Sequence, residues 1–149
     1  MLELLKAKAK GLNESLVRFS RKIGDCRVTR DETVGFTNLL ADEMKSLDYD
    51  KVMTDKAGNL VGVMKGYGNK EALVVIAHVD VLTPEQNKTE ACLKGGMIKF
   101  KAGVITSIYA GALLKRMLLP LTGDLIVCCV PRSESCDFGI KYLFENQLK

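Results

Sequence analysis

One histidine and a nearby carboxylate are the residues of this chain whose types and spacing could do chemistry. The tripeptide His78-Val79-Asp80 follows the apolar run Leu73–Ala77, and His78 is the only histidine among the 149 residues. Such a run between polar residues is typical of a buried strand in an α/β sheet, and ligands bind at the carboxyl ends of these strands. Strand alternation puts His78 and Asp80 on one side, so Asp80 could orient the imidazole that His78 offers to a metal ion.

Several predicted helices and strands must position this pair. From apolar periodicity, capping residues and turn residues we expect helices over residues 13–23, 29–47, 103–117 and 137–148, and strands over residues 48–54, 60–64, 73–78 and 125–130. Residues 2–10 could extend the first helix with a break near Gly11, whereas residues 83–96 are expected to form a loop. The pattern predicts one α/β domain over residues 1–149, in which residues 1–12 could be a loosely held N-terminal extension.

The composition narrows the classes of protein to consider. The chain is 47% hydrophobic and 27% charged, which is typical of a soluble globular domain. The net charge of +4 comes without an aromatic-interleaved basic patch, so we expect no nucleic-acid partner. No segment reaches transmembrane length, and the charges interleaved over residues 1–8 are unlike a signal peptide, so we expect no membrane partner.

The cysteines favour a reducing compartment. There are five, with no Cys-x-x-Cys pair, which disfavours a disulfide framework and a structural zinc site and predicts a cytoplasmic protein. Cys128 and Cys129 are neighbours on a predicted strand, so we expect them to point to opposite faces as core residues. Cys136, at the start of the last predicted helix, could form a Cys–His pair with His78, but packing is the favoured interpretation for these cysteines.

Four segments, in order over residues 13–148, match a known family. They are Asp50–Gly62, Ala77–Asp80, Lys101–Gly111 and Gly123–Glu134. Together they resemble the zinc-dependent metallopeptidase superfamily of acetylornithine deacetylase, succinyl-diaminopimelate desuccinylase and aminoacylase; the glutamyl aminopeptidases share that catalytic fold. The resemblance implies a truncated zinc-peptidase-like catalytic domain, the N-terminal half only, with three layers and a mixed, mostly parallel sheet flanked by helices.

The resemblance also implies a two-zinc site, of which this chain keeps a part. His78 and Glu134 match zinc ligands, and Asp80 matches the residue that orients the histidine. The position of the bridging aspartate holds Lys99, whose ammonium cannot ligate a metal. The general-base position holds Ser133, whose hydroxyl is unsuited to that role near neutral pH. A residual zinc site could still form from His78, Asp80 and Glu134, but we expect no cofactor. Lys99 could instead pair with Asp80 or Glu134 in place of the lost cation.

Three functions remain open, and the sequence does not decide whether the chain is an enzyme. The first is a degenerate metallopeptidase-like or amidohydrolase-like domain with impaired or no catalysis, acting as an interaction or assembly module. The second is a metal-dependent peptidase or deacylase that hydrolyses dipeptides or N-acyl amino acids, alone or completed by a second chain. The third is a purely structural subunit. The apolar strand Leu125–Val130 predicts an exposed sheet edge, so we expect a homo-oligomer or a partner chain.

Overall fold

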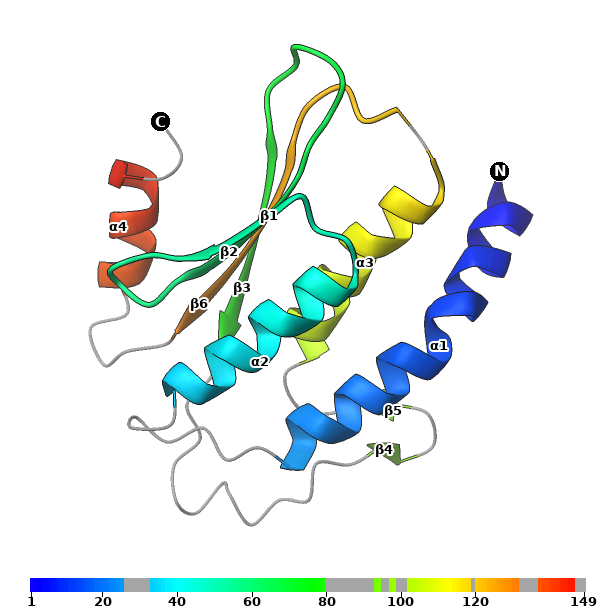
Figure 1. Ribbon diagram of the computed structural model, residues 1–149, viewed down its shortest axis with the longest axis horizontal. Coiled ribbons are helices and arrows are strands. Elements are labelled where there is room, and N and C mark those ends of the chain that lie inside the picture. Colours follow the sequence, from blue (N-terminus) through cyan, green and yellow to red (C-terminus); the bar gives the residue numbers. More distant parts are fainter. Residues whose placement is uncertain are drawn as a thin grey trace.

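The computed structural model describes residues 1–25, 33–79, 93–94, 97–98, 102–118, 120–131 and 137–146. Within these residues, helices and strands follow one another in the predicted order, with the addition of one short hairpin, β4–β5 (Figure 1). In chain order the elements are α1 (Leu2–Asp25), α2 (Thr33–Ser46), β1 (Lys51–Thr54), β2 (Leu60–Met64), β3 (Leu73–Val79), β4 (Leu93–Lys94), β5 (Met97–Ile98), α3 (Ala102–Arg116), β6 (Leu125–Pro131) and α4 (Asp137–Asn146). The hairpin begins inside the segment predicted as loop.

Helix α1 is longer than predicted and runs through Gly11 without a break. A glycine inside a helix costs only about 1 kcal/mol relative to alanine, and no atom lies within 4 Å of the place that a Gly11 Cβ would occupy. The apolar residues Leu12, Phe19 and Ile23 are all buried. Their burial stabilises the helix by far more than the glycine costs, so the predicted break is wrong.

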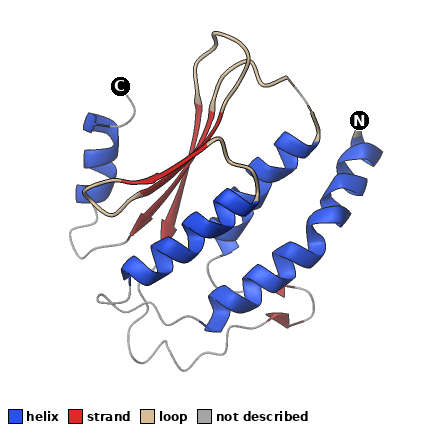
Figure 2. Ribbon diagram, viewed as in Figure 1, coloured by secondary structure: helices blue, strands red, loops and turns tan. Residues whose placement is uncertain are grey.

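The main sheet is mixed, as predicted, with the strand order β1-β2-β6-β3. Strands β1 and β2 form an antiparallel hairpin, β2 is antiparallel to β6, and β3 is parallel to β6. Two of these three pairings are therefore antiparallel, so the description "mostly parallel" does not hold for the described strands. The one parallel pair, β3 and β6, brings two carboxyl ends to the same edge of the sheet (Figure 2).

Strand β6 lies inside the sheet, which corrects the expectation that Leu125–Val130 is an exposed edge. It pairs with β2 on one side and with β3 on the other. Its apolar sequence has a different cause: helices cover both faces of the strand, and most of its side chains are buried. The edges of the sheet are instead β1 and β3.

Helices cover the two faces of the sheet unequally (Figure 1). On one face, α2 packs on β1 and β2 while α3 packs on β3 and β6. Helix α1 packs on α3 and lies farther from the sheet. On the other face, α4 is the only helix within the described residues, and it packs on β6. We call these the α2/α3 face and the α4 face.

Strand alternation divides the core between the two faces. The larger hydrophobic cluster joins α1, α2 and α3 to residues such as Val127 and Cys129. On the α4 face, the smaller cluster of buried apolar residues among those described consists of Val61, Cys128, Val130 and Leu143, and the neighbouring apolar side chains are half-buried. Cys128 and Cys129 therefore point to opposite faces as core residues, which confirms the prediction for this pair.

Tyr49 fills the space between β2 and α3 on the α2/α3 face. Its ring is buried, and its hydroxyl donates a 2.8 Å hydrogen bond to the carbonyl oxygen of Ile108. A Cβ on Gly62 would lie 2.8 Å from the Tyr49 ring, and a Cβ on Gly111 would lie 3.1 Å from the ring carbon that bears the hydroxyl. These two glycines leave room for the ring, and together they set the distance between helix and sheet.

Candidate functional site

The carboxyl ends of β3 and β6 place His78 at one edge of the sheet. His78 has Val130 as its Cα partner, and the next pair along is Val79 with Pro131. The turn between β1 and β2 reaches the same edge, because a Cβ on Gly58 would lie 3.7 Å from Pro131 Cγ. In α/β sheets this edge, beyond the carboxyl ends of parallel strands, is where ligands bind.

The His78 side chain is exposed, while its strand neighbours Ala77 and Val79 are buried. Alternation puts His78 on the α4 face, in line with Val74 and Ile76. The imidazole makes no hydrogen bond or ion pair with any other described residue. The predicted position of His78 at a strand end is confirmed.

The other predicted site residues lie outside the described residues. These are Asp80, Lys99, Ser133, Glu134 and also Cys136. Among the residues that are described, no three His, Cys, Asp or Glu side chains gather closely enough to hold a metal ion. Of the three metal ligands expected from the sequence, His78 is the one that lies within the described residues.

A buried polar tie at this edge was not foreseen from the sequence. In the turn between β1 and β2, the Asp55 carboxylate accepts hydrogen bonds from the backbone N–H groups of Ala57 and Asn59 at 2.8 and 2.9 Å. The Asn59 amide donates to Asp55 Oδ2 at 2.8 Å and to the Gly139 carbonyl oxygen at 2.8 Å. Sequence signals indicate the turn, but they do not indicate that its asparagine contacts α4, 80 residues later.

Asn59 is completely buried, and its Oδ1 atom accepts no hydrogen bond. A Cβ on Gly139 would lie 2.9 Å from this oxygen, so the glycine in the first turn of α4 is what allows the close approach. A buried acceptor without a donor costs free energy. The amide hydrogen bonds to Asp55 and Gly139 hold the side chain in place despite that cost.

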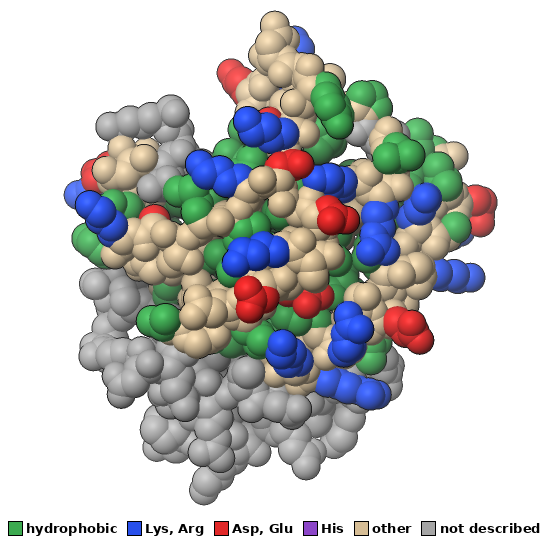
Figure 3. All heavy atoms as spheres, in the orientation of Figure 1, with side chains coloured by type: hydrophobic (Ala, Val, Ile, Leu, Met, Phe, Trp, Pro, Cys, Tyr) green, Lys and Arg blue, Asp and Glu red, His purple; other side chains and the backbone are tan. Residues whose placement is uncertain are grey.

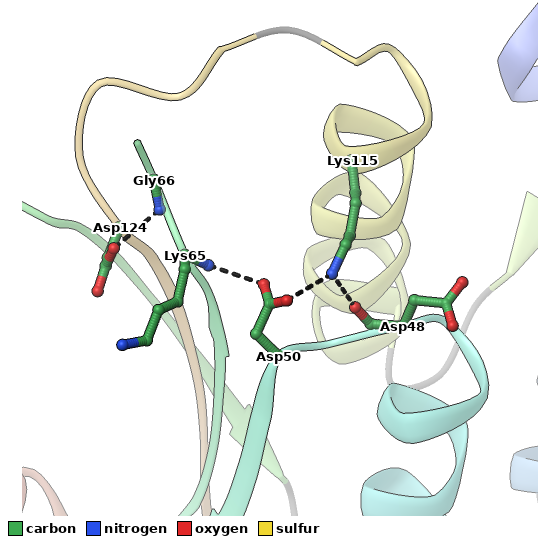
Figure 4. Close-up of polar contacts among 6 residues, drawn as sticks. All are labelled: Asp48, Asp50, Lys65, Gly66, Lys115 and Asp124. Atoms are coloured by element: carbon green, nitrogen blue, oxygen red, sulfur yellow. Dashed lines mark hydrogen bonds and ion pairs between the residues drawn. The ribbon is translucent and has the colours of Figure 1, made fainter. Parts of the chain in front are cut away.

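A second polar cluster lies at the opposite end of the sheet (Figure 4). The Lys115 ammonium, from the end of α3, donates to Asp50 Oδ1 at 2.8 Å and also to the Asp48 carbonyl oxygen. Asp50 Oδ2 accepts the backbone N–H of Lys65 at 2.9 Å. The hydrogen bond from Lys115, and next the one from Lys65, hold the pKa of the Asp50 carboxyl below its ordinary value.

Asp124 repeats this arrangement, because its Oδ1 accepts the backbone N–H of Gly66 at 2.8 Å (Figure 4). A cavity of about 400 Å³ lies beside the cluster, and Asp50, Tyr67, Lys115 and Leu118 contribute to its lining. Its volume is large enough for a small ligand. The ion pair is already satisfied, however, and Asp50 also accepts a backbone hydrogen bond. The cluster therefore joins strand ends to α3 rather than presenting a free acid or base.

The described cysteines are not suited to nucleophilic chemistry. Burial raises the pKa of the Cys128 thiol to about 11 and that of the Cys129 thiol to about 12, and both are free thiols. Since the thiolate is the nucleophile, both residues remain protonated and act as small core side chains. Burial likewise raises the pKa of Tyr109, whose hydroxyl donates a 2.5 Å hydrogen bond to Glu43 Oε1 between α3 and α2.

The surface seen in Figure 3 carries basic and acidic side chains interspersed over the face that α1 and α2 form. An example is the pair of Lys6 and Glu3, whose charged atoms lie 2.9 Å apart on α1. Among the described helices, none is both long and apolar enough to cross a membrane.

Solved structures share this fold. A dinuclear metal-binding peptidase of the M20 family from Bacillus subtilis, YxeP, matches with a TM-score of 0.65 and 14% identity over 91% of this chain. A glutaminyl cyclase from Bacteroides thetaiotaomicron matches with a TM-score of 0.61, 16% identity and 91% coverage. An aminoacylhistidine dipeptidase from Vibrio alginolyticus matches with a TM-score of 0.55, 16% identity and 82% coverage.

These structures are longer than this chain, which spans 39%, 56% and 28% of their respective lengths. No protein-family model and no curated protein matches the sequence. Identities this low establish the fold alone. The predicted α/β fold, a mixed sheet flanked by helices, is thus confirmed.

Proposed function

We propose that this chain is a metallopeptidase-like domain with impaired or no catalysis that acts as an interaction or assembly module. Its fold, shared with a dinuclear metal-binding peptidase, is the observation that carries the proposal. The sequence supplies the second half of the argument. Its ligand set departs from that of the superfamily at Lys99 and Ser133.

The chemistry of the donor set supports loss of catalysis. A two-metal site needs several anionic or imidazole donors around both ions, and this chain has one histidine. By the resemblance, Lys99 takes the position of the shared carboxylate ligand, where an ammonium would be repelled by two dications. Ser133 takes the position of the general base and lacks a carboxylate's ability to accept a proton near neutral pH.

A metal-dependent peptidase or deacylase is the second candidate, favoured by one observation. His78 is exposed at the carboxyl end of the parallel pair β3 and β6, unengaged by other described residues. With Asp80 and Glu134 it could complete a site for one zinc ion, whose chemistry would be to polarise an amide carbonyl and activate water. The substrates implied by the resemblance are dipeptides or N-acyl amino acids, and a second chain could supply further ligands.

Metal analysis combined with a hydrolysis assay separates the two candidates. The protein is purified without chelator, its zinc content is measured, and it is incubated with dipeptides and N-acetyl amino acids. We expect substoichiometric zinc that does not differ between the wild type and His78→Ala, and no hydrolysis above the rate without protein. Stoichiometric zinc lost in His78→Ala, together with turnover that the same variant abolishes, would establish the second candidate instead.

A further inference from the structure

The two edges of the main sheet differ in length and in charge. Strand β1 has four residues and begins with the exposed Lys51. Strand β3 has seven residues, Leu73–Val79, and none is an acid, a lysine, an arginine or a proline. Short or charged edges resist pairing with other chains, and long uncharged edges invite it. By this criterion β1 is a protected edge and β3 is not.

The backbone groups on the outer side of β3 can be assigned. The N–H of Leu73 donates to the Asp124 carbonyl oxygen at 2.8 Å, so the backbone polar groups of Leu73 point toward β6. Successive residues of a strand alternate in this direction. The N–H and C=O groups of Val74, Ile76 and His78 therefore point outward, and no strand among the described residues pairs with them.

The side chains of β3 are also incompletely covered. Leu73 is 63% exposed. On the α4 face, Val74 and Ile76 are only half-buried, and α4 packs mainly on β6 rather than on β3. A sheet edge with unpaired backbone groups and exposed apolar side chains is where a strand of another chain usually adds to a sheet.

We infer that β3 pairs with β3 of a second copy of this chain, in antiparallel orientation about a two-fold axis at Ile76. In this register Val74 lies opposite His78 of the other copy, and the outward backbone groups of both strands face one another. All seven residues are then paired. The arrangement is isologous, as most homodimers are.

For a second copy of this chain, charge favours pairing through β3 over pairing through β1. The chain has a net charge of +4, which opposes self-association over most surfaces. Strand β3 contributes no lysine, arginine, aspartate or glutamate, so self-pairing sets no two of these charges opposite one another. In the same pairing through β1, Lys51 would lie opposite Thr54 of the other copy, so each strand would bring one ammonium group to the interface. A second copy would be the partner in the assembly role proposed above, and in this respect the inference rests on that proposed function. The pairing geometry itself does not depend on zinc.

Sedimentation velocity at tens of micromolar protein tests the dimer directly. We expect the wild type to sediment as a species of twice the 16.4 kDa chain mass. Ile76→Lys sets two ammonium groups opposite each other at the two-fold axis and should give monomer. Mixing Ile76→Lys with Ile76→Glu in equal amounts should restore the dimer, because only a self-opposed position turns repulsion into attraction in this way.

Ile126→Lys is the matched control. Ile126 is the same residue type, is half-buried on the same face, and lies on the inner strand β6 beside Val74. The control should stay dimeric. Circular dichroism melts of all variants show which of them are folded.

Hydrogen exchange on the wild type provides a measurement that needs no variant. The amides of Val74, Ile76 and His78 should exchange at least tenfold more slowly at high protein concentration than in dilute protein, whereas those of Val75 and Ala77 should not change. A wild type that is monomeric at tens of micromolar overturns the inference. So does a folded Ile76→Lys that remains dimeric, or exchange at these three amides that does not depend on concentration. The zinc assay above can fail without affecting any of these results.

Discussion

The two faces of the sheet are held by different means. The α2/α3 face is covered by two helices with a third behind them, and its core contains large buried side chains such as Phe19, Ile105 and Ile108. Within the described part of the chain, the α4 face has one helix and a cluster of four buried apolar residues. Side-chain hydrogen bonds also join helix and sheet on each face, among them the one from Lys115 to Asp50 on the first and the one from Asn59 to Gly139 on the second.

The comparison shows how a helix is positioned on a sheet face that buries little apolar surface. On the α2/α3 face the tie is partly exposed, with both side chains more than a third accessible, and the packing alone positions the helices. On the α4 face the tie is fully buried. We conclude that the position of α4 depends on Asn59 more strongly than the position of α3 depends on Lys115.

The largest expected effect is on the α2/α3 face. Phe19→Ala removes a ring that is 2% exposed and contacts Tyr109, with a centroid distance of 6.2 Å. The free energy of unfolding should fall by about 3–5 kcal/mol, measured by urea denaturation. Phe144→Ala removes the same ring from a position that is 55% exposed and should change the stability by less than about 0.5 kcal/mol. Equal losses in the two variants would remove the basis of the comparison.

Leu143→Ala tests the apolar part of the α4 face. The side chain is completely buried and is the α4 residue that enters this core. We expect a loss of about 2–3 kcal/mol, at the low end for such truncations because the smaller core can relax. Hydrogen exchange should accelerate in α4 before it accelerates in α3. Uniform acceleration throughout the chain would mean that the two faces unfold as one unit.

Asn59→Ala tests the buried tie. It leaves the Gly139 carbonyl oxygen without its donor, so we expect a loss of about 1–2 kcal/mol and faster exchange in the first turn of α4. Asn146→Ala is the control, because that amide makes one exposed hydrogen bond, 3.0 Å long, within the same helix. If the two variants lose equal stability, the tie does not position α4.

Asp50→Asn should have the smallest effect, below about 1 kcal/mol, because the pair with Lys115 is exposed to solvent. The pKa of Asp50 is lower in the folded chain than in the unfolded one. Its contribution to stability is therefore present above the ordinary aspartate pKa of about 4 and is lost as the pH falls through the folded value. The difference in unfolding free energy between wild type and Asp50→Asn should be constant from about pH 7 to pH 5 and then shrink. A difference that grows on acidification would contradict this assignment.

Much of the fold follows from sequence patterns. Apolar periodicity locates all four helices and the four strands of the main sheet, because each buries a continuous stripe or run. The order of strands is not accessible in this way. The apolar run of β6 reports burial on both faces and says nothing of its neighbours, so an edge and a central strand look alike.

The site is predictable only in part. The strand before His78 and the change from apolar to polar residues are enough to place that histidine at a strand end. The role of Asn59 was not predictable, because a turn signal is local while the contact with Gly139 crosses 80 residues. The continuous α1 shows the opposite case, since long-range packing of Leu12 and Phe19 outweighs the local signal at Gly11.

Tyr49, Gly62 and Gly111 constrain one another in a way that extends beyond this chain. The tyrosine ring occupies the volume that a side chain at either glycine would need. Substitutions at these three positions should therefore covary among descendants of a common ancestor. A chain with alanine or larger at the equivalent of Gly62 or Gly111 should carry a small residue at the equivalent of Tyr49, and restoring the tyrosine alone should be deleterious.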